Sequence, residues 1–269
     1  MPAAARDDDV YLRLLLDPLK ECAKYRPAFG GESEDGVSLD QFRQLYGADP
    51  LYRWVGLDSE LMYAAHKAAG GMTSVYRQLG IGCERLLRHI VMNNCSLNEE
   101  QVKWSYKYKK EDGKEGVHTL DARIDATMLD RSKASTVNAW LRQTASKKLG
   151  LARSRVQSLK GIVMEVRQGY KSADAKRQNA DLRFGARAFN EEYLPAVVIV
   201  STQMSLPVCR RYEAAQMLVL VGKNSGTSAE STFTFFRDVV GYDLADFFKR
   251  NSPRLRKEFT DVLEGLLSP

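Results

Sequence analysis

The chain has 269 residues, 44% of them hydrophobic and 28% charged, and a formal net charge of +6. This composition is typical of a globular protein long enough to bury a full core. No segment approaches the roughly 18 consecutive apolar residues of a membrane span, so we expect no membrane association. The four cysteines stand singly and the three histidines lack metal-ligand spacing. These features disfavour a disulfide scaffold, a zinc site and a Ser-His-Asp enzyme, and the cytoplasm is the expected location.

In chain order, the pattern predicts helices, a hairpin, strands alternating with helices, and further helices. The expected helices before the hairpin cover residues 10–25, 40–46, 58–69 and 75–92. Gly70-Gly71 is expected to end the third of them, with Thr73 or Ser74 capping the fourth. The alternating runs 102–108 and 117–126 flank a turn and predict the hairpin.

Beyond the hairpin, apolar β-branched runs alternate with polar helical segments. We expect strands over 161–168, 194–202 and 217–222 and helices over 131–159, 172–189, 212–216 and 229–267. This order predicts an α/β fold with a mixed central sheet flanked by helices and with helical additions at both ends. The expected regions, forming one compact domain, are 1–74, a core over 75–225 that includes a basic helical insertion at 131–159, and 226–269.

The positive charge is concentrated in one stretch. Residues 131–177 hold 12 Lys and Arg and 2 Asp and Glu, whereas the remaining 28 basic and 32 acidic residues give a net charge of −4. Between Arg131 and Met164 there are eight basic residues and no acidic one. A solvated helix usually mixes both signs. The stretch therefore predicts a surface that binds a polyanion, with an ordinary basic face as the alternative.

Two carboxylates interrupt apolar strands on either side of this stretch. Strand alternation places Asp121, Arg123 and Asp125 on one face, and Glu165 shares a face with Arg167. A carboxylate in an apolar strand is costly unless it is paired or bound to metal. If the two strands are neighbours, Asp121 and Glu165 can reach one Mg²⁺, which prefers one or two carboxylates together with water and phosphate oxygens. The alternative is that both acids only pair with the two arginines.

An acid on one strand, an acid-x-basic triplet on the next and then a polar helix resemble the PD-(D/E)XK nuclease pattern. The run EVRQGYKSADAKRQNAD (165–181), followed by LPAVV (194–198), resembles the ApaLI-like type II restriction endonucleases, as does QLGIGCERLL (78–87). The resemblance covers roughly residues 75–220. It implies Mg²⁺-dependent hydrolysis of double-stranded DNA at a short, palindromic site, by a homodimer in a bacterial cytoplasm. A companion DNA methyltransferase is also implied.

The sequence departs from the pattern where the motif has its lysine, because this position is Arg167. Arginine is not deprotonated in proteins and is no general base, but it can neutralise charge on the reacting phosphate. Lys171 and Lys176 are candidates for the missing ammonium group. Gln168 is either a site residue or a sheet-edge amide. Glu84 resembles the additional helical metal ligand of many such nucleases, with a plain surface glutamate as the alternative.

The leading hypothesis is a type II restriction endonuclease in which Asp121 and Glu165 bind Mg²⁺. Side chains of the basic stretch are candidates for DNA contacts: Asn138, Arg142, Gln143, Lys147, Lys148, Arg153, Arg155 and Gln157. Two other hypotheses remain, a non-catalytic DNA-binding protein with a decayed site and a sequence-nonspecific repair nuclease. Five phenylalanines of the C-terminal region either form the homodimer contact or pack on the core: Phe233, Phe235, Phe236, Phe247 and Phe248.

Overall fold

The computed structural model describes residues 3–29, 36–109, 113–170 and 175–268. It is an α/β structure with mixed sheets, and the chain divides into two units, Met1–Gly82 with Arg250–Pro269 and Cys83–Lys249. The first unit contains helices α1 (Ala3–Lys20), α2 (Leu39–Gly47), α3 (Pro50–Trp54), the first part of α4 (Glu60–Cys95) and α12 (Ser252–Leu267), with a 3-10 turn over Glu21–Lys24. This division groups α12 with the N-terminal helices, whereas the sequence pattern grouped it with residues 226–269.

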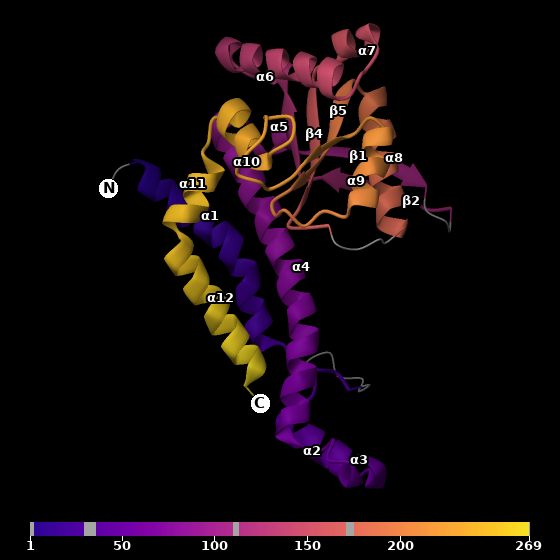
Figure 1. Cartoon of the computed structure of the whole chain (residues 1–269), viewed down its shortest axis with the longest axis vertical. Coiled ribbons are helices and arrows are strands. Elements are labelled where there is room, and N and C mark those ends of the chain that lie inside the picture. The colour runs from indigo at the N-terminus through magenta and orange to yellow at the C-terminus, as the bar shows by residue number, and fades with distance from the viewer. Residues whose placement is uncertain (1–2, 30–35, 110–112, 171–174, 269) are drawn as a thin grey trace. The chain divides into compact units, whose positions relative to one another are not determined.

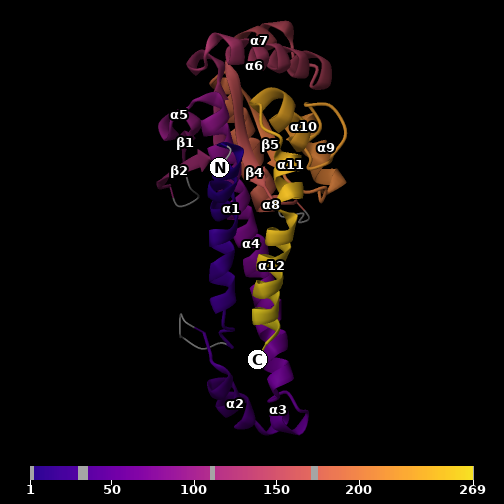
Figure 2. The same cartoon turned by 90° about the vertical axis from the view of Figure 1, so that its left-hand side faces the viewer.

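Helix α4 runs through Gly70-Gly71, so the predicted helix end at this pair and the predicted cap at Thr73 or Ser74 are wrong. The glycines serve close packing. A Cβ at Gly70 would lie 2.0 Å from the Tyr25 hydroxyl, and one at Gly71 would lie 2.4 Å from a Leu266 methyl. Figures 1 and 2 show α1 and α12 alongside the first part of α4.

Gly82 gives a direct test of this packing. A Cβ at Gly82 would lie 2.4 Å from the Leu15 carbonyl oxygen, whereas a Cβ at Gly80 meets nothing within 4 Å. We expect Gly82→Ala to lower the free energy of unfolding by about 1–3 kcal/mol, because backbone must move to admit the methyl group. The matched Gly80→Ala change is expected to raise it by about 0.5–1 kcal/mol, since alanine favours a helix over glycine. Urea denaturation of both variants measures the difference, and equal effects would contradict the close approach of α1 and α4.

The second unit contains the sheets. Its strands are β1 (Trp104–Lys109), β2 (Glu115–Leu120), β3 (Ala122–Asp125), β4 (Gly161–Arg167), β5 (Tyr193–Ile199) and β6 (Leu218–Leu220). Its helices, besides the end of α4, are α5 (Glu99–Val102), α6 (Arg131–Gln143), α7 (Arg153–Ser158), α8 (Ala175–Asn190), α9 (Leu206–Ala214), α10 (Thr232–Phe235) and α11 (Leu244–Arg250). Short 3-10 and π turns cover Ala126–Met128, Thr144–Lys148 and Phe236–Val240.

The predicted hairpin forms as β1 and β2, which pair antiparallel. The second predicted run does not continue in one sheet, because the chain leaves the hairpin at Asp121 and enters a four-stranded sheet as β3. That sheet has the order β3-β4-β5-β6, with β3 antiparallel to β4 and the other pairs parallel. Helices α8 and α9 make the two parallel crossovers, as parallel strands require. The mixed sheet with flanking helices agrees with the predicted α/β class.

Both faces of this sheet are buried. One face, with Val163 and Val197, packs with Phe184 of α8 and Tyr212 of α9. The other face carries Met164, which is also inaccessible to solvent. Trp104 and Tyr106, on the aromatic face of the hairpin, belong to the same core cluster as Val163 and Val197. The sheet therefore lies between layers of other elements, as in α/β proteins.

Three of the five C-terminal phenylalanines are core residues. Phe235, Phe236 and Phe247 are at most 1% exposed, so they are not available for contact with a second copy. Phe233 and Phe248 are partly buried and stack edge to face. No helix in the described part of the chain has the length and apolarity needed to cross a membrane.

Candidate active site

Asp121 lies where the chain passes from β2 to β3. Its backbone N–H donates to the Met164 carbonyl oxygen at 3.1 Å, and its Oδ2 accepts from the Val166 N–H at 2.7 Å. The β3–β4 register pairs Ala122 with Met164, and one further residue brings Asp121 opposite Glu165. The two acids predicted to share a site thus lie on the same face of adjacent strands.

Glu165 lies between two basic side chains. It is 8% exposed in a strand whose other residues through Val166 are almost fully buried. Its Oε1 lies 3.0 Å from Arg167 Nη2, and its Oε2 lies 3.8 Å from His118 Nε2 on β2. His118 of the hairpin therefore lies beside the strand acids. Glu165 and Arg167 do share a face, as strand alternation requires.

A third carboxylate, Glu84, comes from the last turns of α4. Burial raises the pKa of Glu84, and the charge of Glu165 raises it further. Burial, followed by the charges of Glu165 and Glu84, raises the pKa of Asp121 to about 8. After burial, the charge of a neighbouring carboxylate is therefore the next cause of both shifts. Protons or a bound cation would relieve this repulsion.

Arg88, also on α4, partly offsets this repulsion. Its Nε donates to the Asp121 carbonyl oxygen at 2.6 Å, and its Nη2 lies 3.5 Å from Asp121 Oδ1. Arg88 was not among the site residues expected from the sequence. It occurs one helical turn after Glu84, so both side chains lie on the same side of α4. Arg88 therefore holds Asp121 from α4, while the backbone of Met164 and Val166 holds it from β4.

Arg167 bridges two acids. Its Nη2 lies 3.0 Å from Glu165 and donates to Asp181 Oδ1 at 2.8 Å. Its Nε is buried with no hydrogen-bond partner in the described part of the chain. Although burial would lower the pKa of Arg167, the charges of Glu165 and Asp181 outweigh it, and the pKa is raised. The guanidinium therefore stays charged and shares its charge between the two carboxylates.

Asp181 is a second residue that sequence reasoning missed. It is 3% exposed on α8, and its Oδ2 accepts hydrogen bonds from the hydroxyls of Tyr212 at 2.6 Å and Tyr170 at 3.4 Å. Burial raises the pKa of Asp181, while Arg167 opposes this shift. One signal was available in the sequence, because Asp181 lies on the same helical stripe as Gln178 and Phe184, which are also buried.

The other predicted catalytic residues are more peripheral or lie outside the description. Gln168 follows β4 and is partly buried, and its carbonyl oxygen accepts from the Ser201 N–H at 3.0 Å. Lys176 is exposed on the first turn of α8. Lys171 lies outside the described residues. Asp125 is committed to structure, since its Oδ2 accepts from the Tyr193 hydroxyl at 2.6 Å and its Oδ1 from the Thr127 N–H at 2.9 Å.

The basic stretch forms α6, a π turn and α7, which lie across one end of the four-stranded sheet in both views (Figures 1 and 2). Of its eight cations, Lys133 donates to the Val240 carbonyl oxygen and Lys160 lies over the Tyr193 ring. Six are exposed: Arg131, Arg142, Lys147, Lys148, Arg153 and Arg155. Among the predicted polar contacts, Gln143 and Gln157 are exposed and Asn138 is partly buried. Most of the predicted DNA-binding side chains thus face solvent on this basic surface.

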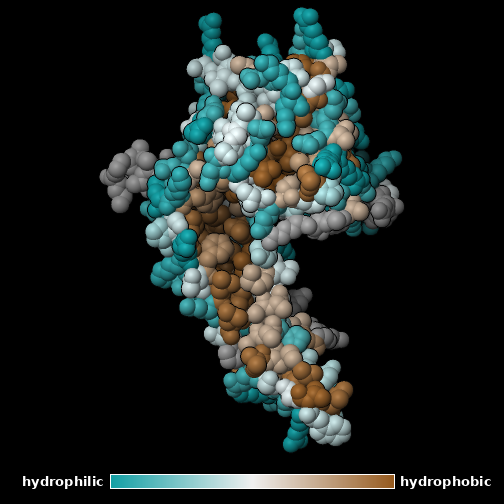
Figure 3. Space-filling model, viewed as in Figure 1, coloured by the Kyte–Doolittle hydropathy of each residue, from teal (hydrophilic) through white to brown (hydrophobic). Residues whose placement is uncertain are grey.

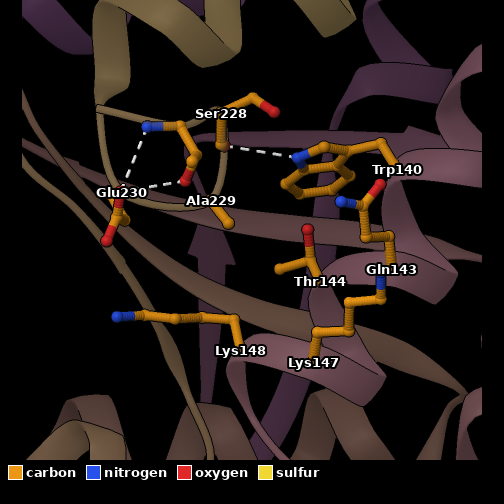
Figure 4. A pocket seen from close by; sticks show the side chains of 9 residues that line it. Trp140, Gln143, Thr144, Lys147, Lys148, Ser228, Ala229 and Glu230 are labelled. Carbon is orange, nitrogen blue, oxygen red and sulfur yellow. Dashed lines mark hydrogen bonds between the residues drawn. The ribbon is translucent and has the colours of Figure 1, made fainter. Parts of the chain in front are cut away.

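A cavity of about 250 Å³ opens in the basic surface. Gln143, Lys147 and Lys148 line it together with Trp140 and the loop 227–230 (Figure 4). The Trp140 indole N–H donates to the Ser228 carbonyl oxygen at 3.2 Å. Three of the predicted DNA-binding side chains therefore surround one hollow.

Neither a metal-binding cluster in the described part of the chain nor a known relative identifies the site. Within the described residues, no group of three or more His, Cys, Asp and Glu side chains has the arrangement of a complete metal site. No family model, no curated protein and no solved structure matches the chain.

Proposed function

We propose that the protein is a Mg²⁺-dependent endonuclease of the PD-(D/E)XK type that hydrolyses double-stranded DNA at a specific site, as a type II restriction endonuclease does. The observation that carries the proposal is the pairing of Asp121 and Glu165 across β3 and β4, with the charge of Glu84 contributing to the raised pKa of Asp121. A positively charged surface in the same unit, formed by a stretch with no acidic residue between Arg131 and Met164, supplies the complementary feature, a place for the DNA backbone.

The donor set suits Mg²⁺. Asp121 and Glu165 offer carboxylate oxygens, which Mg²⁺ takes together with water and phosphate oxygens, and Glu84 is the third candidate ligand. Burial is the main cause of the raised pKa of Asp121, and the charges of Glu165 and Glu84 add to it; a divalent cation would relieve this repulsion. Bound there, Mg²⁺ would polarise the phosphodiester and lower the pKa of the attacking water.

The chain's own cations complete the proposed site. Arg167 is held beside Glu165, where its charge can stabilise the developing negative charge on the reacting phosphate. Lys171 and Lys176 remain candidates for the position that the motif gives to lysine. Glu165 is the fifth residue of β4, about 13 Å along the strand from its first residue at about 3.3 Å per residue. This separation corresponds to about four base-pair rises of 3.4 Å, so DNA held on the basic surface can extend to the reacting centre.

The proposal includes a homodimer, because cutting both strands of a palindrome takes two sites related by a two-fold axis. It also includes a companion DNA methyltransferase that protects the host's own sites. A second candidate function is non-catalytic DNA binding. It is favoured by Arg167, which stands at the lysine position and pairs with both Glu165 and Asp181.

Incubation of the protein with plasmid and genomic DNA in Mg²⁺ tests the proposal. Discrete fragments are the expected result. A smear would indicate a sequence-nonspecific repair nuclease. The absence of cleavage, combined with salt-sensitive DNA binding, would support the non-catalytic function and overturn the nuclease. A parallel reaction with Ca²⁺ in place of Mg²⁺ separates binding from cleavage.

The basic surface leads to a salt-dependence prediction. If about five of its cations contact phosphates, the slope of log K against log salt for duplex DNA should be near −4.5. Replacing Arg153 and Arg155 by Ala should flatten the slope by up to about two units, because each lost phosphate contact removes about 0.9. The matched control is Arg256→Ala with Lys257→Ala, which removes the same charge from exposed positions on α12. Equal slopes for the two double variants would show that the surface does not contact DNA.

A further inference from the structure

An exposed apolar patch covers the end of the first unit formed by α2, α3 and the start of α4. Five of the ten large hydrophobic side chains exposed in the described residues fall within this segment. They are Leu45 (52% exposed), Leu51 (58%), Trp54 (81%), Val55 (59%) and Leu61 (79%). Figure 3 shows hydrophobic atoms gathered over α2 and α3. We call these five residues the α2–α3 patch. Single exposed apolar residues are ordinary, but a concentration of this kind marks an interaction surface.

The patch is held in place by the structure beneath it. Phe42 is fully buried, with its ring 4.4 Å from that of Tyr46, which in turn lies 4.8 Å from Tyr52. Asp49 caps α3 by accepting hydrogen bonds from the N–H groups of Leu51 and Tyr52. The exposed side chains therefore project from short, capped helices on an aromatic base. A surface ordered before binding loses less entropy when a partner covers it.

The charges around the patch favour one kind of partner. Arg43 is paired with Asp40 and Glu60, whereas Arg53 and Asp58 have no ion-pair partner within the described residues. These two opposite charges flank Trp54 and Val55 in the sequence. A surface that meets an identical surface across a two-fold axis must be self-complementary, and an apolar segment that carries both an unpaired cation and an unpaired anion satisfies this condition. The segment 39–61 carries four acidic and two basic residues, which disfavours DNA and anionic lipid as partners.

We propose that the α2–α3 patch binds the same patch of a second copy of this chain. In this isologous dimer, Trp54 and Val55 lie at the centre, and Arg53 of each copy faces Asp58 of the other. The inference does not rest on the proposed nuclease activity, because it follows from exposure and charge alone. It places the dimer contact on the N-terminal helices instead of on the C-terminal phenylalanines.

Sedimentation of the full chain without DNA or metal tests this surface. The wild-type protein should have about twice the 30.3 kDa chain mass at micromolar concentration. The double change Trp54→Asp and Val55→Asp should give a monomer, since it buries two charges at the centre of the contact. The matched control is Val117→Asp, at a valine that is 63% exposed on β2, and it should remain dimeric. A monomeric wild type, or a dimeric Trp54→Asp/Val55→Asp variant with a folded circular-dichroism spectrum, would overturn the proposal.

Charge reversal makes the test specific for the Arg53–Asp58 contact. Arg53→Asp places two acids together twice in its own dimer, and Asp58→Arg places two cations together twice, so each variant alone should dimerise at least tenfold more weakly. In an equimolar mixture, each mutated residue faces the complementary charge, and a heterodimer should form with near-wild-type affinity. If the single variants dimerise normally, or if the mixture fails to recover dimers, the proposed pairing is wrong. Nuclease activity does not enter either readout. A monomeric wild type would count against the homodimer of the proposed function as well, whereas a folded and dimeric Trp54→Asp/Val55→Asp variant would overturn only the α2–α3 contact.

Discussion

Replacing Asp121 by Asn or Glu165 by Gln is expected to slow single-turnover DNA cleavage in Mg²⁺ by at least about a thousandfold. Both changes keep the shape of the side chain, and the amide introduced by Asp121→Asn retains an oxygen for the Val166 N–H. Each removes a negative charge from the proposed metal ligands. A bound metal contributes several kcal/mol to transition-state stabilisation, and each 1.36 kcal/mol corresponds to a factor of ten in rate. Specific DNA binding in Ca²⁺ should persist.

The control for this pair is Glu115→Gln, an exposed residue on β2 whose carboxylate lies 3.4 Å from Lys107. It should cut at the wild-type rate. Glu84→Gln tests the third carboxylate, and we expect it to raise the Mg²⁺ concentration needed for half-maximal cleavage. If Asp121→Asn cuts normally, the site assignment is wrong. Asp125 would not replace Asp121, because its oxygens are engaged by Tyr193 and Thr127.

Arg167→Ala is expected to lower the cleavage rate at least a hundredfold while leaving DNA binding largely unchanged. A donor directed at developing charge contributes about 3–4 kcal/mol, which corresponds to this factor or more. Arg167→Lys should keep part of the activity, because it preserves the charge and restores the common motif. Lys171→Ala should also cost at least a hundredfold, and Lys176→Ala should be milder. Single-turnover rates at saturating enzyme give the ranking, and a normal rate for Arg167→Ala would reverse it.

The ion pair between Arg167 and Asp181 gives the Arg167→Ala change a second effect, on stability. Removing Arg167 leaves Asp181 buried without its cation, so Arg167→Ala should also destabilise the fold by about 3–5 kcal/mol. Asp181→Asn keeps an acceptor for the Tyr212 hydroxyl but removes the competing charge, so Arg167 should bind Glu165 more tightly. We therefore expect Asp181→Asn to need more Mg²⁺ for half-maximal cleavage. Tyr212→Phe removes one hydrogen bond from Asp181 but no charge, and it should shift the Mg²⁺ requirement much less.

The strands of the central sheet were predictable because their signal is local. The run around Val163 and the run around Val197 are apolar and β-branched, and both form strands within a few residues of the expected bounds. Asp121 and Glu165 were identified for the same reason, since a carboxylate is conspicuous in an apolar strand. Their pairing follows from the antiparallel register. The role of the pair in catalysis stays a prediction.

Features that depend on distant residues were not predictable. Gly70 reads as a helix end in the sequence, and only the approach of the Tyr25 hydroxyl explains why a glycine stands inside α4. The helical stripe that Asp181 shares with Phe184 is visible in the sequence, but the contacts of Asp181 with Tyr212 and Arg167 are not. The phenylalanines of the C-terminal region read equally well as surface or core. Tertiary packing decides whether such a residue is buried and whether a helix continues, and the periodicity of the sequence alone does not predict that packing.

The segment that carries the basic surface leaves the sheet at Asp125 and returns at Gly161, and these two residues are register partners. Antiparallel partners lie about 5 Å apart, so the segment is closed at its base whatever its length. Because the entropy of closing a loop grows only slowly with length, the segment can be exchanged without moving Asp121 relative to Glu165. A graft that retains the buried stripe of α6, Val137, Trp140 and Leu141, would keep the segment seated. Under the proposed function, the fold would separate the part that chooses a DNA sequence from the part that cuts it, and specificity would be transplantable.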